Sequence, residues 1–207
     1  MRYRAVENYH RQQHFDFFRP YPNPFYSITF ELDATDLKVW LKQKGYPIYL
    51  NLCYFLTKAM REVEDFRYRL LDDQMVLYED LHLGITVPSS DGLFSFAHYD
   101  FHPDTATFNR MAAEHADEGR GEATLETMSH TNYTYCTAIP GVAFTSFVHA
   151  TPADTTDGAP RIAFGQFVER EGRLMVPVGM TVNHIFIDGS ALGALAQGAQ
   201  ALYSNPC

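Results

Sequence analysis

Hydrophobic and polar residues alternate most regularly near the C-terminus, from Leu174 to His184. Side chains of a β-strand point alternately to its two faces, so the even-numbered positions share one face. That face is apolar up to its last position, with the order Leu174, Val176, Val178, Met180, Val182 and His184. The pattern predicts a strand that ends in an imidazole, followed by Asp188, Gly189 and a helix.

The rest of the pattern predicts strands and helices without a strict β-α-β repeat. Alternating segments predict strands over 25–32, 68–71, 75–79, 82–87, 93–99, 133–138, 143–149 and 161–168. Apolar residues at helical spacing predict helices from residue 33 or 35 to about residue 44, and over 49–66, 108–118 and 189–203, with a short helix or turn within 5–19. This order favours an α+β fold, a mixed β-sheet flanked by helices, in a single domain over 1–207.

Composition and charge exclude several kinds of protein. The chain has 207 residues, 46% of them hydrophobic, and a formal net charge of -9, so nucleic acid and anionic membranes are poor partners. Its three cysteines are far apart and form no CxxC pair, which argues against a disulfide framework and a zinc site. The N-terminus has no apolar signal-peptide segment and no window approaches a membrane span, so we expect a cytoplasmic protein.

The end of the 174–184 strand is a candidate centre for acyl transfer to a hydroxyl. Such a transfer needs a base that reaches the hydroxyl proton, and His184, on an apolar face, suits this role. It also needs a donor for the oxyanion, and Ser146 is the candidate because its predicted strand face otherwise carries Phe144 and Val148. Asp188 has two interpretations: it orients catalytic groups, or it caps the last helix, and on the residues alone the cap is favoured.

Other histidines form weaker constellations. His98 and His102 are four residues apart, but they lie in a strand-to-loop region without the helical geometry that metal ligands at this spacing need. The sequence has no P-loop, Rossmann or G-x-S-x-G motif. We therefore expect no metal centre.

Four segments resemble, in the same order, the chloramphenicol acetyltransferase family of trimeric O-acetyltransferases that use acetyl-CoA. They are the aromatic and basic segment 9–18, the hairpin 66–73, the serine segment 144–147 and the C-terminal motif 174–189. The resemblance implies the CoA-dependent acyltransferase fold, a mixed sheet flanked by helices. It also implies acetyl-CoA as co-substrate, chloramphenicol or a related small hydroxylated compound as acceptor, a role in antibiotic resistance, and a homotrimer with its sites between subunits.

The resemblance also assigns roles to single residues. His184 is the general base and Ser146 donates to the oxyanion, whereas Asp188 pairs with Arg11 and holds the His184 turn in shape. The side chains that it places at the acceptor are Phe18, Phe94, Phe96 and Thr145.

Some positions depart from the family's pattern. Ala163 stands where the family has a threonine that assists the transition state, and Gln166 and Pro47 stand where it has basic residues near CoA. Phe96 occupies a position where a smaller residue is usual. Two alternatives stay open: a binding protein of the same fold that has lost efficient transfer, and the catalytic core of a dihydrolipoyl acyltransferase, which the lack of a lipoyl domain or Ala/Pro-rich linker disfavours.

Overall fold

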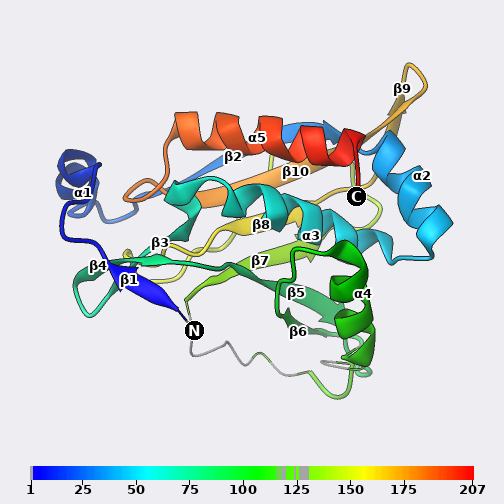
Figure 1. Cartoon of the computed structure of the whole chain (residues 1–207), viewed down its shortest axis with the longest axis horizontal. Coiled ribbons are helices and arrows are strands. Elements are labelled where there is room, and N and C mark those ends of the chain that lie inside the picture. Colours follow the sequence, from blue (N-terminus) through cyan, green and yellow to red (C-terminus); the bar gives the residue numbers. More distant parts are fainter. Residues whose placement is uncertain (1, 116, 118–119, 124, 126–130) are drawn as a thin grey trace.

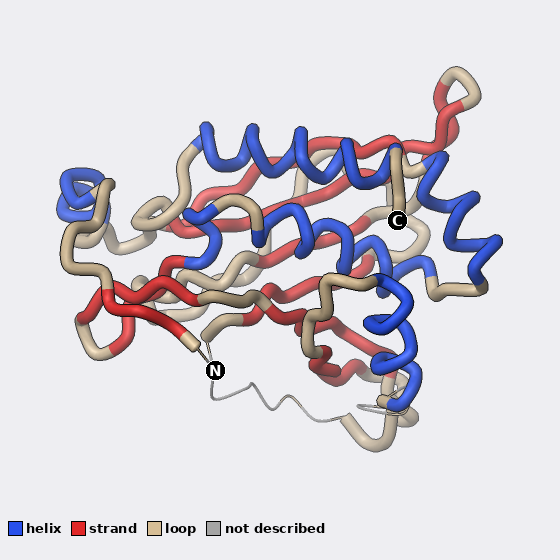
Figure 2. Tube along the Cα trace, in the orientation of Figure 1, coloured by secondary structure: helices blue, strands red, loops and turns tan. Residues whose placement is uncertain are grey.

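The computed structural model describes residues 2–115, 117, 120–123, 125 and 131–207. Its strands form one sheet of seven strands and one of three. Two long helices, α3 (Ile48–Arg61) and α5 (Gly189–Ser204), pack against each other and cover the same face of the larger sheet (Figures 1 and 2). The predicted architecture, a mixed β-sheet flanked by helices, is confirmed.

The larger sheet consists of β2 (Phe25–Asp33), β5 (His82–Pro88), β6 (Phe94–Tyr99), β7 (Tyr133–Ala138), β8 (Arg161–Phe164), β9 (Val168–Arg170) and β10 (Arg173–Asn183). Its order is β2-β10-β8-β7-β5-β6, and β9 pairs with the first residues of β10. β10 is antiparallel to β2 and β8, and β5 is antiparallel to β6. β7 is parallel to both β5 and β8, so the sheet is mixed.

The two faces of β10 differ, as its alternation predicts. On the helical face, which packs under α3 and α5, the side chains of Val176, Val178, Met180 and Val182 are at most 2% exposed. The opposite face, here called the outer face, carries Gly179 and Thr181. The segment 141–150 packs on this outer face, since a Cβ atom on Gly179 would lie 2.6 Å from the Cβ of Phe147.

The smaller sheet has the order β1 (Tyr3–Ala5), β4 (Gln74–Tyr78) and β3 (Tyr68–Leu71). β3 and β4 form the predicted hairpin, but Gln74, expected in the connection, already belongs to β4. The turn consists of Asp72 and Asp73, whose φ angles of 47° and 62° are positive. Two consecutive residues with positive φ are what a two-residue hairpin turn requires, and aspartate tolerates this conformation better than most residues.

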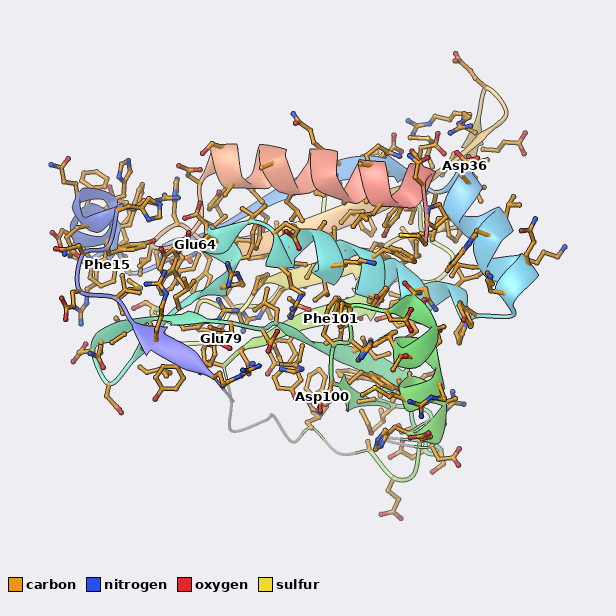
Figure 3. The ribbon with its side chains drawn as sticks, in the orientation of Figure 1. Phe15, Asp36, Glu64, Glu79, Asp100 and Phe101 are labelled. Atoms are coloured by element: carbon orange, nitrogen blue, oxygen red, sulfur yellow. The ribbon has the colours of Figure 1, made fainter. Side chains whose placement is uncertain are left out.

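The other helices are α1 (Gln12–Phe18), α2 (Thr35–Lys44), α4 (Thr105–Glu114) and the 3-10 turn η1 (Glu64–Arg67). α2 ends as predicted, because Gly45 adopts a left-handed φ of 72°. α1 lies at one end of the molecule and buries Phe15 (Figure 3). Among the described residues, each helix is too short or too polar to cross a lipid bilayer.

Two predicted helices have different bounds in the structure. The helix predicted over 49–66 ends at Arg61, because Val63 is extended, with φ -104° and ψ 108°, and Phe66 is buried by η1 instead. The helix predicted over 108–118 begins earlier, at Thr105, because the Asp104 side chain caps it by accepting a hydrogen bond from the Thr107 amide. α4 ends at Glu114, and residues 116 and 118 of the predicted helix lie outside the described residues.

The strand predicted over 143–149 is wrong. Segment 141–150 is irregular, since the amide of Phe147 donates to Thr29 Oγ1 at 3.1 Å and that of His149 to Thr181 Oγ1 at 3.3 Å. These amides bond to threonine side chains of β2 and β10 and therefore do not build a backbone ladder. The strand predicted over 161–168 is divided into β8 and β9.

Candidate active site

His184 directly follows β10 and lies where three elements converge. Its backbone amide donates to the carbonyl oxygen of Pro24 at 2.9 Å. Its ring stacks on Phe18 of α1, with centroids 4.1 Å apart and an interplanar angle of 12°, and contacts Tyr26 of β2 at 4.6 Å. Nδ1 is buried and makes no hydrogen bond to the described residues, so Nε2 is the ring nitrogen suited to meet an acceptor hydroxyl.

The turn after His184, residues 185–187, is held by hydrogen bonds to Asn183 on one side and Tyr26 on the other. Ile185, Phe186 and Ile187 are fully buried. The backbone carbonyl of Asn183 accepts from the amides of Phe186 and Ile187 at 3.1 and 3.0 Å, and its side-chain Oδ1 accepts from the Ile185 amide at 3.0 Å. Tyr26 donates its hydroxyl to the Ile187 carbonyl at 3.3 Å, and burial raises the pKa of Tyr26 to about 12. The hydroxyl of Tyr26 therefore stays protonated and acts as a donor.

Asp188 makes contacts that fit both interpretations of the sequence. Its Oδ1 accepts from the amides of Ser190 and Ala191 at 2.9 and 3.1 Å and thereby caps α5. Its Oδ2 lies 3.3 Å from Nη1 of Arg11. Partial burial acts to raise the pKa of Asp188, but the hydrogen bonds from Ser190 and Ala191 and the charge of Arg11 hold it below its ordinary value. The ion pair with Arg11 does not displace the cap.

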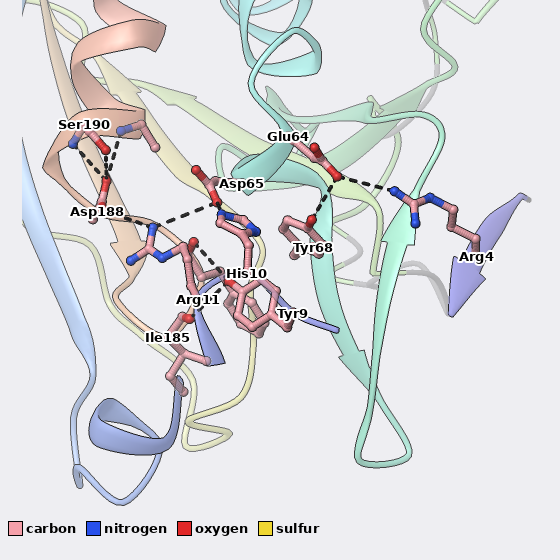
Figure 4. A network of polar contacts seen from close by, with 12 residues as sticks. Arg4, Tyr9, His10, Arg11, Glu64, Asp65, Tyr68, Ile185, Asp188 and Ser190 are labelled. Atoms are coloured by element: carbon pink, nitrogen blue, oxygen red, sulfur yellow. Dashed lines mark hydrogen bonds and ion pairs between the residues drawn. The ribbon is translucent and has the colours of Figure 1, made fainter. Parts of the chain in front are cut away.

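Arg11 links the N-terminal segment to this turn (Figure 4). Its side chain is 7% exposed, and Nη1 also lies 3.9 Å from Oδ1 of Asp65, whose Oδ1 is 3.4 Å from Nε2 of His10. These contacts do not have hydrogen-bond geometry, so the attraction is mainly coulombic. Burial raises the pKa of Asp65, although Arg11 and His10 act to lower it. Sequence reasoning found Arg11 and missed Asp65.

Ser146 and Thr145 lie in the irregular segment 141–150. Both side chains are exposed in the single chain, whereas the prediction gave Ser146 a position on an apolar strand face. Neither residue lines the cavity described next. Within one chain, the structure brings together His184, Phe18, Asp188 and Arg11.

A cavity of about 600 Å³ opens on the outer face of the sheet. Two side chains predicted to contact the acceptor, Phe94 and Phe96 of β6, form part of its wall, whereas His184 does not. Further lining residues come from strands β3, β5, β7 and β8 and from the loop before β8: Arg69, Leu70, Thr86, Tyr135, Cys136, Thr137, His149, Ala150, Pro152, Asp154, Thr156, Asp157, Gly158, Ala159, Arg161 and Ile162, together with Thr131. The volume suits a ligand of drug size.

Charged side chains in this wall were missed by sequence reasoning. Arg161 donates from Nη2 to Oδ2 of Asp157 at 2.6 Å, and Arg69 is 1% exposed. Burial lowers the pKa of His149 to about 4, so this histidine is neutral near pH 7. Arg69 belongs to the segment 66–73 that carries the family resemblance, but the resemblance gives it no role at a site, and His149, Asp157 and Arg161 lie outside the four matching segments.

The positions that depart from the family's pattern lie apart from the His184 turn. Ala163 is fully buried in β8, whereas Gln166 and Pro47 are exposed. A lysine of α2 lies near each exposed position: Lys38 Nζ is 4.9 Å from the ring of Phe167, the neighbour of Gln166, and Lys44 lies three residues before Pro47.

A mixed sheet with helices on one face, and a histidine turn and capping aspartate after its long strand β10, are features of an acyltransferase of the CoA-dependent fold. A family model described as chloramphenicol acetyltransferase matches residues 1–200, and the chain belongs to this family. The predicted membership is confirmed, and with it the class of the enzyme, a CoA-dependent O-acetyltransferase.

Relatives and solved structures agree with this assignment. A chloramphenicol acetyltransferase of Bacillus pumilus is 27% identical over 190 residues, covering 90% of this chain and 86% of the relative. One of Proteus mirabilis is 24% identical over 202 residues, covering 95% and 92%. A solved chloramphenicol acetyltransferase superposes with a TM-score of 0.86 at 26% identity, covering 98% of this chain and 100% of that one. A dihydrolipoamide acetyltransferase of Azotobacter vinelandii, at TM-score 0.64 and 15% identity, shares the fold.

Proposed function

We propose that this protein transfers the acetyl group of acetyl-CoA to a hydroxyl of chloramphenicol or a related small hydroxylated compound, with His184 as general base. The observation that carries this proposal is the position of His184 at the end of β10. Its ring stacks on Phe18, and the turn that follows is hydrogen-bonded to Asn183, Tyr26 and Tyr9. A base held in this way loses little orientation freedom when the acceptor binds.

The proposed reaction moves one proton and one acetyl group. His184 Nε2 takes the proton of the acceptor hydroxyl while its oxygen attacks the thioester carbonyl carbon. The tetrahedral intermediate carries an oxyanion, which Ser146 stabilises by donating a hydrogen bond. When the intermediate collapses, the C–S bond breaks and the thiolate of CoA receives the proton from His184, which leaves the acetyl ester and free CoA.

The proposed reaction requires a homotrimer with its sites between subunits. His184 and the cavity have separate linings within one chain, and Ser146 is exposed there. Large apolar side chains near Ser146 and at the cavity are also exposed, including Val148 at 71% and Phe94 at 48%. Burial of such side chains favours association. Light scattering during gel filtration would give the mass of a trimer, and a monomeric mass with full activity would contradict this part of the proposal.

Binding of acetyl-CoA separates the enzyme from a binding protein of the same fold. We expect titration calorimetry to detect CoA, with Lys38 and Lys44 supporting its anionic groups at the positions next to Gln166 and Pro47. A double variant, Lys38→Ala with Lys44→Ala, weakens CoA binding in this proposal. If the wild type binds no CoA, the transfer proposal fails. The alternative is then supported, that is, a protein of the same fold that has lost efficient transfer.

The decisive experiment measures release of the CoA thiol from acetyl-CoA with chloramphenicol and a panel of hydroxylated acceptors. The wild type releases thiol in step with the acetylated acceptor, and His184→Ala abolishes this release without loss of the folded state. His102→Ala is the matched control, because His102 is half-buried, like His184, but belongs to neither the turn nor the cavity. Equal rates for His184→Ala and the wild type would overturn the role of His184.

A further inference from the structure

The cavity on the outer face holds more positive than negative buried charge. Arg69 is fully buried, and its described hydrogen bonds all go to backbone carbonyls: Nε to Thr131 at 2.7 Å, and Nη1 to Phe66 at 2.9 Å and Tyr68 at 2.7 Å. Nη2 makes no hydrogen bond to the described residues. Among the described residues, the Arg69 guanidinium is therefore not hydrogen-bonded to any carboxylate.

The carboxylate of Asp157 is the counter-charge for two guanidiniums, those of Arg161 and Arg69. Asp157 is 19% exposed and pairs with Arg161, which is 18% exposed. The second acidic residue of the lining, Asp154, is exposed and accepts hydrogen bonds from the amide and hydroxyl of Thr156, so water screens its charge. His149 is neutral near pH 7. The buried part of the lining therefore carries an excess of one positive charge.

Burial also makes the charged form of Arg69 less favourable. Burial lowers the pKa of Arg69 to about 10, although Asp157 acts to raise it. The charged guanidinium is therefore less stable inside the wall than in water, and an additional anion nearby would stabilise it. In a protein of net charge -9, a positive lining is a local feature that the overall composition does not explain.

The wall beside these charges is aromatic. Phe96 contacts Phe94 and Tyr135 edge-to-face, with both pairs of centroids 6.0 Å apart. Tyr135 reaches this position because it packs against Gly84, where a Cβ atom would lie 3.0 Å from its ring. A planar apolar group fits between such rings. The cavity therefore offers an aromatic surface on which a ring can pack, and a positive electrostatic potential that favours an anion.

We propose that the preferred acceptor is a hydroxylated aromatic compound that carries a carboxylate. Its ring lies against Phe94 and Phe96, and its carboxylate lies beside Arg161, in the field of Arg69. Arg161 is the contact residue, since Nη2 of Arg69 is enclosed in the wall and acts through its charge. This inference rests on the proposed acetyl transfer and narrows its acceptor from small hydroxylated compounds in general to anionic aromatic ones.

The test compares two acceptors of equal size that differ in charge, para-hydroxymethylbenzoate and para-hydroxymethylbenzamide. With acetyl-CoA and the full chain, we expect kcat/KM to be about 10- to 100-fold higher for the carboxylate. Equal values for the two acceptors, or a preference for the amide, would overturn the inference.

Two variants move this preference in opposite directions. Arg161→Gln removes the contact cation and leaves Asp157 unpaired, so the ratio of kcat/KM for carboxylate over amide falls toward one or below. Asp157→Asn removes the buried counter-charge, so the same ratio rises. A purely structural effect of either variant changes both acceptors in parallel, and that result counts against the inference.

Failure of this inference can be told apart from failure of the transfer proposal. If no acceptor, including chloramphenicol, releases the CoA thiol, the transfer proposal fails. Calorimetry of the two acceptors with the wild type and Arg161→Gln then still tests the cavity. Tighter binding of the carboxylate that is lost in Arg161→Gln supports the charge assignment, and equal binding in both proteins contradicts it.

Discussion

Asn183 donates from its side-chain amide to the backbone carbonyl of Asp157 at 3.0 Å, and so joins the His184 turn to the wall of the cavity. The same Nδ2 donates to the carbonyl of Thr155 at 2.8 Å, while Oδ1 accepts from the Ile185 amide. The side chain is 2% exposed and uses both its donors and its acceptor. The segment that carries the proposed base and the segment that carries the charged wall are thus held by one residue.

We predict that Asn183→Ala loosens both segments. Two half-buried carbonyls and one buried amide lose their partner, so the free energy of unfolding falls by about 1–3 kcal/mol. The loss of orientation at His184 lowers kcat by about tenfold or more, with a smaller change in KM for acetyl-CoA. Urea unfolding and steady-state kinetics measure the two effects.

Asn205→Ala is the control for this variant, because Asn205 is exposed and its side chain makes only a long contact of 3.5 Å to the Ala201 carbonyl. It should change neither stability nor kcat by a measurable amount. An Asn183→Ala protein with wild-type kcat would show that the turn holds His184 without this link.

A second prediction separates the two roles of Asp188. Asp188→Asn keeps an oxygen that accepts from the amides of Ser190 and Ala191, but it removes the charge opposite Arg11. Asp188→Ala removes both. A lost N-cap destabilises a helix by about 1 kcal/mol. The free energy of unfolding of the alanine variant should therefore be lower than that of the asparagine variant by about 1 kcal/mol, and its urea midpoint should be lower. Equal midpoints would mean that the cap contributes nothing and that the ion pair is the whole effect.

Elements whose conformation depends mainly on neighbouring residues could be predicted from the sequence alone. The alternation of β10, the Asp72-Asp73 hairpin and the stop of α2 at Gly45 depend on neighbours in sequence, and all three are as predicted. The pairing of Arg11 with Asp188 spans almost the whole chain, and it was predicted only through the family resemblance. No periodicity could have indicated it.

Other features depend on contacts that a local pattern does not contain. The segment around Ser146 has a strand-like alternation, but its amides bond to the hydroxyls of Thr29 and Thr181, which no backbone propensity anticipates. The charges of Arg69, Asp157 and Arg161 meet only because β3, β8 and the loop before β8 border one cavity. In the sequence, Asp157 and Arg161 resemble ordinary surface charges, and the segment 66–73 gives no sign that Arg69 is buried.

A third prediction concerns stability at mildly acidic pH. Burial holds the pKa of His149 at about 4 in the folded protein, against 6.5 as its ordinary value. Between these values the unfolded chain binds a proton that the folded chain does not, so stability falls as the pH is lowered from about 6.5 toward 4 and rises as the pH is raised. Urea midpoints measured across this range should therefore decline more steeply for the wild type than for His149→Asn. Parallel slopes would show that His149 is not buried in its neutral form.

A fourth prediction uses two glycines that differ in their surroundings. A Cβ atom on Gly179 would lie 2.6 Å from the Cβ of Phe147, whereas one on Gly193, in α5, meets nothing within 4 Å. Gly179→Ala must displace segment 141–150 from the outer face, which costs about 1–3 kcal/mol of stability. Gly193→Ala should instead stabilise the protein by roughly 0.5–1 kcal/mol, because alanine favours the helix over glycine.

The same pair of glycines tests the role of Ser146. Displacement of Phe147 moves its neighbour Ser146, so Gly179→Ala should lower kcat in the thiol-release assay while Gly193→Ala leaves it unchanged. Loss of one oxyanion donor lowers kcat by about 10²–10³-fold, which is the limit that Ser146→Ala should approach. Gly179→Ala should fall between the wild type and that limit, because the hydroxyl is moved but still present. A Gly179→Ala protein that is destabilised yet fully active would mean that Ser146 does not act on the oxyanion from this segment.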